Sequence, residues 1–305
     1  MAKLNTFLKL LRTPSKMIRP LARNGLLNWM SDETFAKLVF KDTFGYDLDL
    51  DNPRSFSEKL QWLKLYNRRP EYTMMVDKYR VREYIREKIG EDYLVPLLGA
   101  WERAEDINIE SLPNRFVLKC NHDQGSVVIC KDKSNFDFEA AKRKLAYKLR
   151  KNHYWSTREW PYKNIKPCVI CEKYMEDEGK DSLSDYKVLC FNGEPKLIEV
   201  HRERFGEKHT QDFYDSDWNK TDFNQPCMPM SEEVMEKPPF ADEMISLSRM
   251  LAANMPHIRV DWYYANGHLY FSELTFYDAS GFDSFEGGQD MEIGSWLKLP
   301  PKYND

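Results

Sequence analysis

Two short apolar segments near the end of the chain constrain its fold more than any other feature. Residues 257–263 and 271–275 are apolar runs interrupted by charged side chains, and the dipeptide Asn266-Gly267 lies between them. Asn-Gly between two such runs is typical of a tight β-turn, because both residues accept the positive φ that the turn requires. The sequence therefore predicts an antiparallel hairpin at this point.

This hairpin brings four polar side chains together. Residues two apart on a strand face the same side of a sheet, so Arg259 and Asp261 point the same way, as do Glu273 and Thr275. Asp261 lies five residues before the turn and Glu273 six residues after it. The two carboxylates are therefore expected on neighbouring strands, close to each other in space.

Such a carboxylate pair admits two interpretations. Two carboxylates about 4 Å apart repel each other by roughly 4 kcal/mol at an effective dielectric constant near 20. A bound divalent cation would remove this cost, and hard oxygen ligands suit Mg²⁺. The alternative is a surface hairpin in which Arg259 simply pairs with Asp261 and Glu273.

Composition sets the class of protein. The chain has 305 residues, of which 42% are hydrophobic and 14% aromatic, so it can bury a large core in one domain or in two to three lobes sharing a cleft. The net charge of -4 gives no case for nucleic acid as a partner. No apolar run approaches the roughly 20 residues that a membrane-spanning helix needs. The six cysteines are thinly spread, and we expect reduced thiols in a cytosolic protein.

The first 31 residues are basic and contain no acid. Apolar residues at helical spacing predict an amphipathic helix that Pro14 and Pro20 would interrupt. One interpretation is an anchor to an anionic membrane surface, or an arm over an acidic substrate. The other is a helix packed on the body of the protein with its basic side in water.

Further elements follow from periodicity and turn signals. Ser55 and Glu58 form a capping box at the start of a helix, and Asn192-Gly193 marks a second hairpin between strands at 186–191 and 195–200. Helices are predicted over 33–66 (two), 74–89, 136–152 and 232–254, and strands over 93–98, 116–120, 127–130 and 167–175.

Two regions could bind a nucleotide. Lys119 ends a strand and adjoins a polar loop with Gly125 and Ser126, where a cation and free backbone N–H groups could hold phosphate oxygens. No GxxxxGK[ST] motif is present, which excludes a P-loop NTPase. A lysine at a strand end is also commonly just solvated, so the pattern leaves both possibilities open.

The strand ending in Glu172-Lys173 could offer main-chain groups to an adenine, with Tyr174 lining the pocket, or it could be an ordinary core edge. Asp185 and Lys187 could reach a ribose and a phosphate, or could form a surface pair.

Taken in order, these segments resemble the TupA-like ATP-grasp family of polysaccharide-biosynthesis proteins, whose members are often labelled glycosyltransferases. The resemblance extends from about residue 44 to residue 282. It rests on FSEKLQWLK at 56–64, DKY at 77–79, LKCNH at 118–122, FNGEPK at 191–196, FYD at 213–215 with Trp218, RVD at 259–261 and ELT at 273–275.

The resemblance implies an α+β fold in which two α+β lobes clasp ATP, preceded by a helical N-terminal extension. It divides the chain into a helical N-terminal region (1–70), a small linker or pre-grasp lobe (71–110), an N-terminal grasp lobe (111–175) and a C-terminal grasp lobe (176–305).

The resemblance also implies roles for matching residues. Lys78 and Lys119 would contact the phosphates of ATP, and the loop with Asn121, Gly125 and Ser126 would close over them. The adenine would lie at Glu172, Lys173 and Tyr174, and the ribose and phosphate side would face Asp185 and Lys187. Mg²⁺ would be bound by Asp261, Glu273 and Thr275. Arg259, together with Lys119, would act in catalysis by stabilising charge on the reacting groups. Thr275 departs from the asparagine common in such enzymes and is a weaker ligand, which puts a second Mg²⁺ in question.

The implied activity is ATP-dependent ligation of a carboxylate to an amine through an acyl-phosphate, in cell-surface polysaccharide biosynthesis. The expected partners are an anionic saccharide such as a uronic acid and an amino acid or other amine, in the cytoplasm or peripherally at the inner membrane face. The acceptor pocket would be lined by His201, Arg202, Arg204 and the loop after Thr275. The alternatives are a nucleotide-sugar glycosyltransferase, a kinase and a non-catalytic glycan-binding protein.

Overall fold

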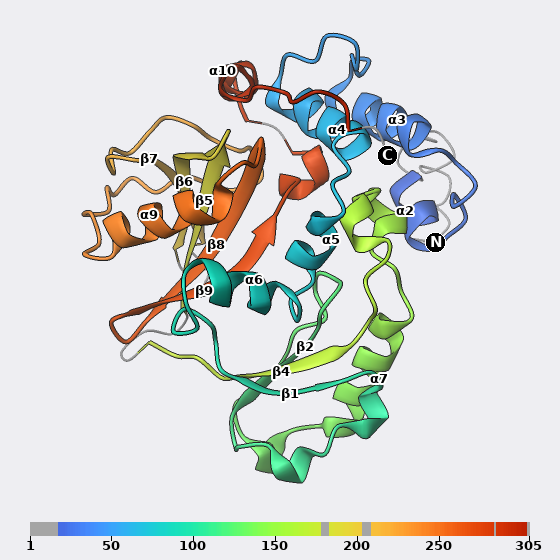
Figure 1. The fold of residues 1–305 in the computed structure, drawn as a ribbon, viewed down its shortest axis with the longest axis vertical. Helices are drawn as coiled ribbons and strands as arrows, with labels where there is room; N and C mark the ends of the chain where they lie inside the picture. Colours follow the sequence, from blue (N-terminus) through green and yellow to red (C-terminus); the bar gives the residue numbers. More distant parts are fainter. Residues whose placement is uncertain (1–17, 178–182, 203–208, 284, 304–305) are drawn as a thin grey trace, which may run out of the picture.

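The computed structural model describes residues 18–177, 183–202, 209–283 and 285–303, and these residues form two antiparallel sheets with helices around them (Figure 1). One sheet has five strands in the order β7-β6-β5-β8-β9, and the other has four in the order β1-β4-β2-β3. The α+β class predicted from the sequence is therefore confirmed.

The five-stranded sheet is built around the two Asn-Gly turns. Its strands are β5 (Ser184–Phe191), β6 (Glu194–Arg202), β7 (Thr210–Asp215), β8 (His257–Ala265) and β9 (His268–Thr275). Both residues of each turn have positive φ: 53° and 87° at Asn192-Gly193, and 50° and 81° at Asn266-Gly267. This is the backbone that matches the twist of the paired strands, so both predicted hairpins are confirmed.

The four-stranded sheet contains β1 (Leu97–Trp101), β2 (Phe116–Cys120), β3 (Val128–Cys130) and β4 (Val169–Lys173). The strand predicted over 93–98 is displaced, because the backbone N–H of Phe271 donates to the carbonyl of Tyr93 and β1 begins only at Leu97. β1 pairs with β4, so a strand from the predicted 71–110 lobe belongs to the sheet of the predicted 111–175 lobe. The domain division otherwise stays a prediction.

The helices largely follow the predicted pattern, with two corrections. They are α2 (Ile18–Arg23), α3 (Asp32–Phe44), α4 (Phe56–Tyr66), α5 (Glu71–Val76), α6 (Val81–Lys88), α7 (Phe138–Leu149), α8 (Tyr154–Thr157), α9 (Ala241–Ala252) and α10 (Gln289–Trp296). The 74–89 helix is wrong: Asp77 Oδ1 accepts from the N–H groups of Tyr79 and Arg80, and this Asx turn separates α5 from α6. The 232–254 helix starts only at Ala241, after Pro238-Pro239, since proline disfavours helix at the residue before it.

The predicted N-terminal helix lies mostly outside the described residues. Pro20 lies in α2, which ends at Arg23, so the helix is shorter than the predicted segment. The predicted interruption at Pro14 and Pro20 concerns residues that are mostly outside the described part and stays a prediction. The capping box is confirmed: Glu58 N donates to Ser55 Oγ, and Ser55 N donates to Glu58 Oε2 at 3.0 Å.

Two separate hydrophobic cores hold the two sheets. One lies beneath the five-stranded sheet and includes residues of α3, α4, α5, α6, α9 and α10; the other joins the four-stranded sheet to α7. In Figure 1, α9 covers one face of the five-stranded sheet and the four-stranded sheet lies at the opposite end of the molecule. The N-terminal helices therefore share a core with the C-terminal part of the chain, and the two lobes face each other.

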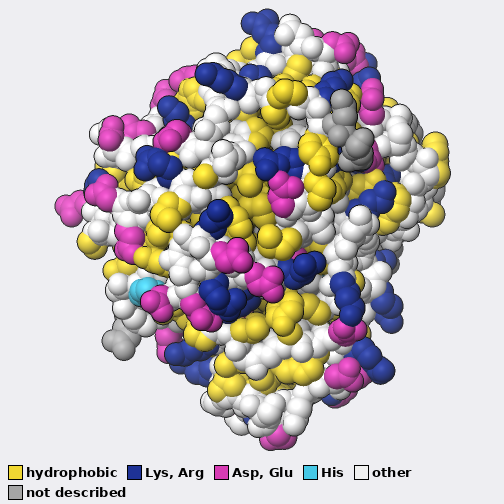
Figure 2. Space-filling view, in the orientation of Figure 1, with side chains coloured by type: hydrophobic (Ala, Val, Ile, Leu, Met, Phe, Trp, Pro, Cys, Tyr) yellow, Lys and Arg dark blue, Asp and Glu magenta, His cyan; other side chains and the backbone are white. Residues whose placement is uncertain are grey.

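Surface and thiol properties agree with the composition. Side chains of both charge signs lie interspersed on the face shown in Figure 2. All six cysteines are free thiols, four of them buried, as predicted. A search of the described residues found no helix with the length and apolar character needed to cross a membrane.

A buried histidine predicts a pH dependence of stability. His257 is 1% exposed and packs between Phe56 and Phe191, with ring centroids 5.0 and 4.9 Å away; neither of its ring nitrogens has a hydrogen-bond partner among the described residues. Burial lowers its pKa from 6.5 to about 3. Below pH 6.5 the unfolded chain therefore binds a proton on His257, whereas the folded chain does not until the pH nears 3. The free energy of unfolding consequently decreases as the pH falls from 6.5 toward 3.

We expect His257→Phe to remove this loss. Between pH 7 and pH 5 the native chain should lose about 2 kcal/mol more unfolding free energy than the variant, at about 1.4 kcal/mol per pH unit below 6.5. Urea unfolding at the two pH values measures this difference. An equal change in both proteins would show that His257 is protonated or hydrogen-bonded in the folded state.

Candidate active site

A row of four charged residues crosses the five-stranded sheet. Strand register places Glu199 of β6 beside Lys187 of β5, Lys187 beside Asp261 of β8, and Asp261 beside Glu273 of β9. Because residues opposite each other in neighbouring strands point to the same face, all four side chains lie on one side of the sheet. That side forms one wall of a cavity of about 460 Å³.

The opposite wall of this cavity comes from the lobe that contains the four-stranded sheet and α7, and from the turn between α5 and α6. Lys119 lies near the end of β2, and the loop after it contributes Gly125 and Ser126. Lys78 follows the Asx turn at Asp77, and its Nζ lies 3.2 Å from Glu273 Oε2 and donates to the carbonyl of Asp123 at 3.1 Å. Segments more than a hundred residues apart in sequence thus meet in one cavity between the lobes.

Most of the predicted site residues line this cavity. They are Lys78, Lys119, Gly125, Ser126, Asp185, Lys187, Arg259, Asp261, Glu273 and Thr275. Alternation along β5, β8 and β9 explains why the six of them that lie on these strands share one face of the sheet. Their chemical roles stay predictions, while their common location is a property of the fold.

Four predicted residues do not line the cavity. Asn121 is buried and structural: its Nδ2 donates to Asp77 Oδ1 at 2.9 Å, and its Oδ1 accepts from Cys168 N at 2.8 Å. Glu172 turns its carboxylate to Lys119 Nζ, 2.7 Å away. Lys173 is exposed, and Tyr174 lies under the guanidinium of Arg115. The adenine contact proposed for residues 172–174 therefore rests on the resemblance alone.

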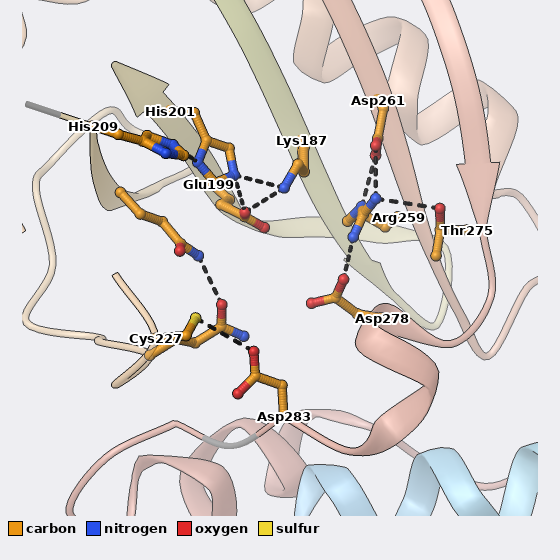
Figure 3. Close-up of polar contacts among 12 residues, drawn as sticks. Lys187, Glu199, His201, His209, Cys227, Arg259, Asp261, Thr275, Asp278 and Asp283 are labelled. Carbon is orange, nitrogen blue, oxygen red and sulfur yellow. Dashed lines mark hydrogen bonds and ion pairs between the residues drawn. The ribbon is translucent and has the colours of Figure 1, made fainter. Parts of the chain in front are cut away.

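Arg259 is the centre of the best-ordered group of contacts (Figure 3). Its Nε and Nη2 donate to the two carboxylate oxygens of Asp261, both at 2.7 Å, in a bidentate pair. Nη1 donates to Asp278, and Nη2 also reaches Thr275 Oγ1 at 3.3 Å. Burial opposes its charge, but Asp261 and Asp278 raise the pKa of Arg259 well above its ordinary value. The side chain is thus a fixed cation at the bottom of the cavity.

The two central carboxylates have pKa values shifted in opposite directions. Burial raises the pKa of Asp261 to about 7, with Glu273 and Asp185 adding to the rise and Arg259 opposing it. Burial also works against the charge of Glu273, but Lys78 and Arg259 outweigh it and lower the pKa of Glu273 to about 2. A second cation at this pair would favour ionised Asp261.

The donor set fits Mg²⁺ chemically. Among the described residues lining the cavity, seven are Asp or Glu and four are Lys or Arg, and the carboxylate and hydroxyl oxygens are ligands that Mg²⁺ accepts. In the described part of the chain no three His, Cys, Asp or Glu side chains are grouped as a metal site. Arg259 holds Asp261 and Lys78 holds Glu273, so a metal would have to loosen these two pairs.

A second polar group lies at the edge of the cavity, and its central residue, Glu199, was missed from the sequence. Glu199 Oε1 accepts a hydrogen bond from Lys187 Nζ at 2.5 Å and lies 2.5 Å from His201 Nε2 (Figure 3). The other ring nitrogen of His201, Nδ1, lies 2.9 Å from His209 Nε2. Lys187 and His201 outweigh the effect of burial and lower the pKa of Glu199 well below its usual value. Glu199 lies two residues before His201 on β6, so strand alternation could have identified it.

The predicted acceptor residues separate in the structure. His201 lines the cavity. Arg202, the next residue on the strand, faces the other way and lies 3.6 Å from Asp212, so its assignment to the pocket is wrong. Arg204 lies outside the described residues.

The turn after β9 (η6, Asp278–Gly281) presents Asp278 to Arg259. Ala279 and Ser280 both adopt left-handed backbone, with φ of 43° and 60°, which is costly for residues other than glycine. Helix α4 holds this turn from beneath: Gln61 Nε2 donates to the carbonyls of Ser280 and Gly281, and Lys64 Nζ donates to that of Ser280 at 2.9 Å. The geometry of this part of the cavity is therefore fixed by the buried helix.

The two-lobed fold and its charged cavity define the chain as an ATP-grasp protein, and the comparison with known families agrees. The model of the TupA-like ATP-grasp family matches residues 58–298. The chain therefore belongs to that family, as the sequence blocks suggested.

The chain is also similar, at low identity, to several solved structures. They include D-alanine–D-alanine ligase from Bacillus anthracis with ATP (19% identity, TM-score 0.39, 67% of this chain and 55% of that chain). Others are a RimK domain ATP-grasp protein from Sphaerobacter thermophilus (13%, TM-score 0.41, 76% and 70%) and D-cycloserine synthetase DcsG (12%, TM-score 0.41, 73% and 69%). The chain spans little more than half the length of the Bacillus anthracis ligase. Comparison with curated proteins gave no match.

Proposed function

We propose that this protein is a magnesium-dependent ligase that uses ATP to join a carboxylate to an amine. The observation that carries the proposal is the cavity between the lobes, where the row from Glu199 to Glu273 faces Lys78 and Lys119. A buried group of carboxylates beside several lysines suits a triphosphate with its metal better than it suits an uncharged ligand. Family membership points to the same nucleotide.

Each side chain then has a defined task. Lys78, Lys119 and Lys187 hold phosphate oxygens, and the loop with Gly125 and Ser126 covers them. Asp261, Glu273 and Thr275 hold Mg²⁺, which offsets the charge of the phosphates when bound. The Arg259 guanidinium stabilises charge on the carboxylate that receives the phosphoryl group.

The substrates are proposed from family membership and charge. The carboxylate belongs to an anionic saccharide, such as a uronic acid of a cell-surface polysaccharide or its precursor, and the amine to an amino acid. The carboxylate attacks the terminal phosphorus of ATP, releasing ADP and forming an acyl-phosphate. The amine then attacks the acyl carbon and phosphate leaves. We also propose that the enzyme acts at the inner face of the membrane and that the basic segment of residues 1–31 contacts the membrane surface.

Calorimetry and product analysis test this function. We expect ATP to bind with Mg²⁺ and only weakly without it, and uronic acids together with amino acids to release ADP and yield an amide by mass spectrometry. A phosphate ester in place of the amide would identify a kinase. Nucleotide-sugar turnover without ATP would favour a glycosyltransferase. Failure of ATP to bind to the folded protein would overturn the proposal.

A further inference from the structure

A second cavity, of about 520 Å³, adjoins the first. Its walls come from α2, α3, α7, the segment after α7 and the turn η6. Three residues line both cavities: Asp123 and Gln124 on one side and Ala279 on the other. One extended ligand could therefore occupy both spaces, passing between the loop after β2 and the left-handed turn at Ala279.

The second cavity is strongly basic, in contrast to the first. Four cations line it, Arg19, Arg23, Lys148 and Lys151, against the single carboxylate of Asp123. That carboxylate already accepts from Ser126 Oγ at 2.5 Å and lies 3.4 Å from Lys148 Nζ. Among the described residues that line this cavity, Asp123 is thus the one carboxylate and it is paired with Lys148, while Asp42 and Asp283 act on Arg19 from outside the lining.

The two outermost cations are available to a ligand. Among the described residues, Arg23 forms no hydrogen bond or ion pair, and the Lys151 ammonium contacts only the ring of Tyr147, 5.1 Å away. Arg19 is more constrained, because its Nη2 donates to Thr43 and its guanidinium lies over Phe282. Burial lowers the pKa of Arg19 and the charge of Arg23 adds to this effect, while Asp42 and Asp283 oppose it.

Aromatic side chains complete the cavity. Phe35, Tyr147 and Phe282 all line it, and Phe282 is held in place by Lys64 Nζ, 4.3 Å from its ring centroid. Each of these rings already has a cation of the protein over it: Arg158 over Phe35, Lys151 over Tyr147, and Lys64 and Arg19 over Phe282. The rings therefore form an apolar wall beside the cations, and this combination suits a multiply charged anionic group carried on an organic ligand. The rigid turn at Ala279 fixes the distance between this cluster and Arg259.

We propose, on the basis of the function proposed above, that the substrate is a phosphorylated saccharide. Its reacting carboxylate lies near Arg259 in the first cavity, and its phosphate or diphosphate group is bound by Arg23, Lys148 and Lys151 in the second. A phosphate carries more charge and more acceptor oxygens than a lone carboxylate, and so matches several converging cations. The substrate would thus extend from the first cavity into the second, past the three residues that line both.

Calorimetry with glucose 1-phosphate, glucose and inorganic phosphate tests this site without any need for turnover. We expect the native protein to bind glucose 1-phosphate at least about ten times more tightly than glucose, and the double variant Arg23→Gln/Lys151→Gln to lose that difference. Arg143→Gln is the matched control, because Arg143 is an exposed cation of α7 that lines neither cavity. Lys119→Gln shows whether the probe sits instead in the ATP cavity.

Each result decides the assignment. The assignment of the second cavity would be overturned by any of three results for glucose 1-phosphate: unchanged affinity in the double variant, an equal loss of affinity in Arg143→Gln, or a loss confined to Lys119→Gln. If inorganic phosphate bound as tightly as glucose 1-phosphate, the proposal that the ligand is a saccharide would be overturned. Mg²⁺-ATP binding, measured on the same samples, should be retained by the double variant. Absence of ATP binding in the native protein would defeat the proposed function, and the glucose 1-phosphate result would still report on the second cavity.

Discussion

Substituting Asp261 by Asn is expected to lower magnesium-dependent ADP formation about 1,000-fold or more while the protein stays folded. The carboxylate of Asp261 lies beside that of Glu273 in the strand register, and stabilisation of phosphoryl transfer by Mg²⁺ is worth several kcal/mol, at 1.36 kcal/mol per tenfold change in rate. Asparagine keeps one oxygen that can accept from Arg259, but its amide nitrogen cannot accept the second hydrogen bond, so thermal melting must accompany the kinetics to confirm that the variant is folded. Initial rates of ADP release across a magnesium titration provide the measurement.

Glu273→Gln should act on binding as well as on rate. Loss of this charge removes a metal ligand and leaves Lys78 without its carboxylate partner, so Mg²⁺-ATP affinity should collapse in calorimetry. Asp290→Asn is a matched control, because Asp290 is a largely buried carboxylate that pairs with Ser57 outside both cavities. A D261N enzyme that remains active and magnesium-dependent would refute the metal assignment.

Local sequence signals account for the parts of the fold that were predicted well. The Asn-Gly turns and the Ser55–Glu58 capping box depend on residues within four positions of each other, so the chain alone specifies them. Strand alternation then placed Arg259, Asp261, Glu273 and Thr275 on one face. Alternation within a strand does not tell which residues of neighbouring strands lie side by side. The strand register of the folded sheet shows this, and it places Lys187 of β5 beside Asp261 and Glu199 of β6 beside Lys187.

The structural predictions that were wrong or incomplete depend on contacts between distant segments or on local interactions that compete with the helical pattern. Asp77 lies in a helical pattern, but its side chain captures two backbone N–H groups and ends the helix. Asp278 is part of the site only because α4, more than two hundred residues earlier, holds the turn that carries it. Asn121 looked like a phosphate-loop residue, although its amide ties the loop to Asp77 and Cys168. The partners of Asp278 and Asn121 are distant in the chain and cannot be read from spacing, whereas the local turn at Asp77 competes with a helical pattern that the spacing of apolar residues favours.

Arg259→Lys tests whether the guanidinium geometry, and not only its charge, is required. Lysine keeps a cation among Asp261, Asp278 and Thr275 but cannot donate two parallel hydrogen bonds to Asp261 while also reaching the other two residues. We expect kcat to fall about 100-fold or more, by analogy with loss of one donor that stabilises developing charge. The KM for ATP should change little, because Lys78 and Lys119 remain.

Arg249→Lys makes the same substitution in the ion pair with Glu194, half-exposed and outside both cavities, and should leave the rate unchanged. Steady-state kinetics of the two variants, with thermal melting to confirm folding, separates the two possibilities. If R259K retained a kcat within about threefold of the native value, Arg259 would serve chiefly to neutralise buried carboxylates, since a lysine does that as well. A large fall in kcat at constant stability would instead place Arg259 in contact with the reacting carboxylate, because only a group that binds more strongly in the transition state changes kcat without changing KM.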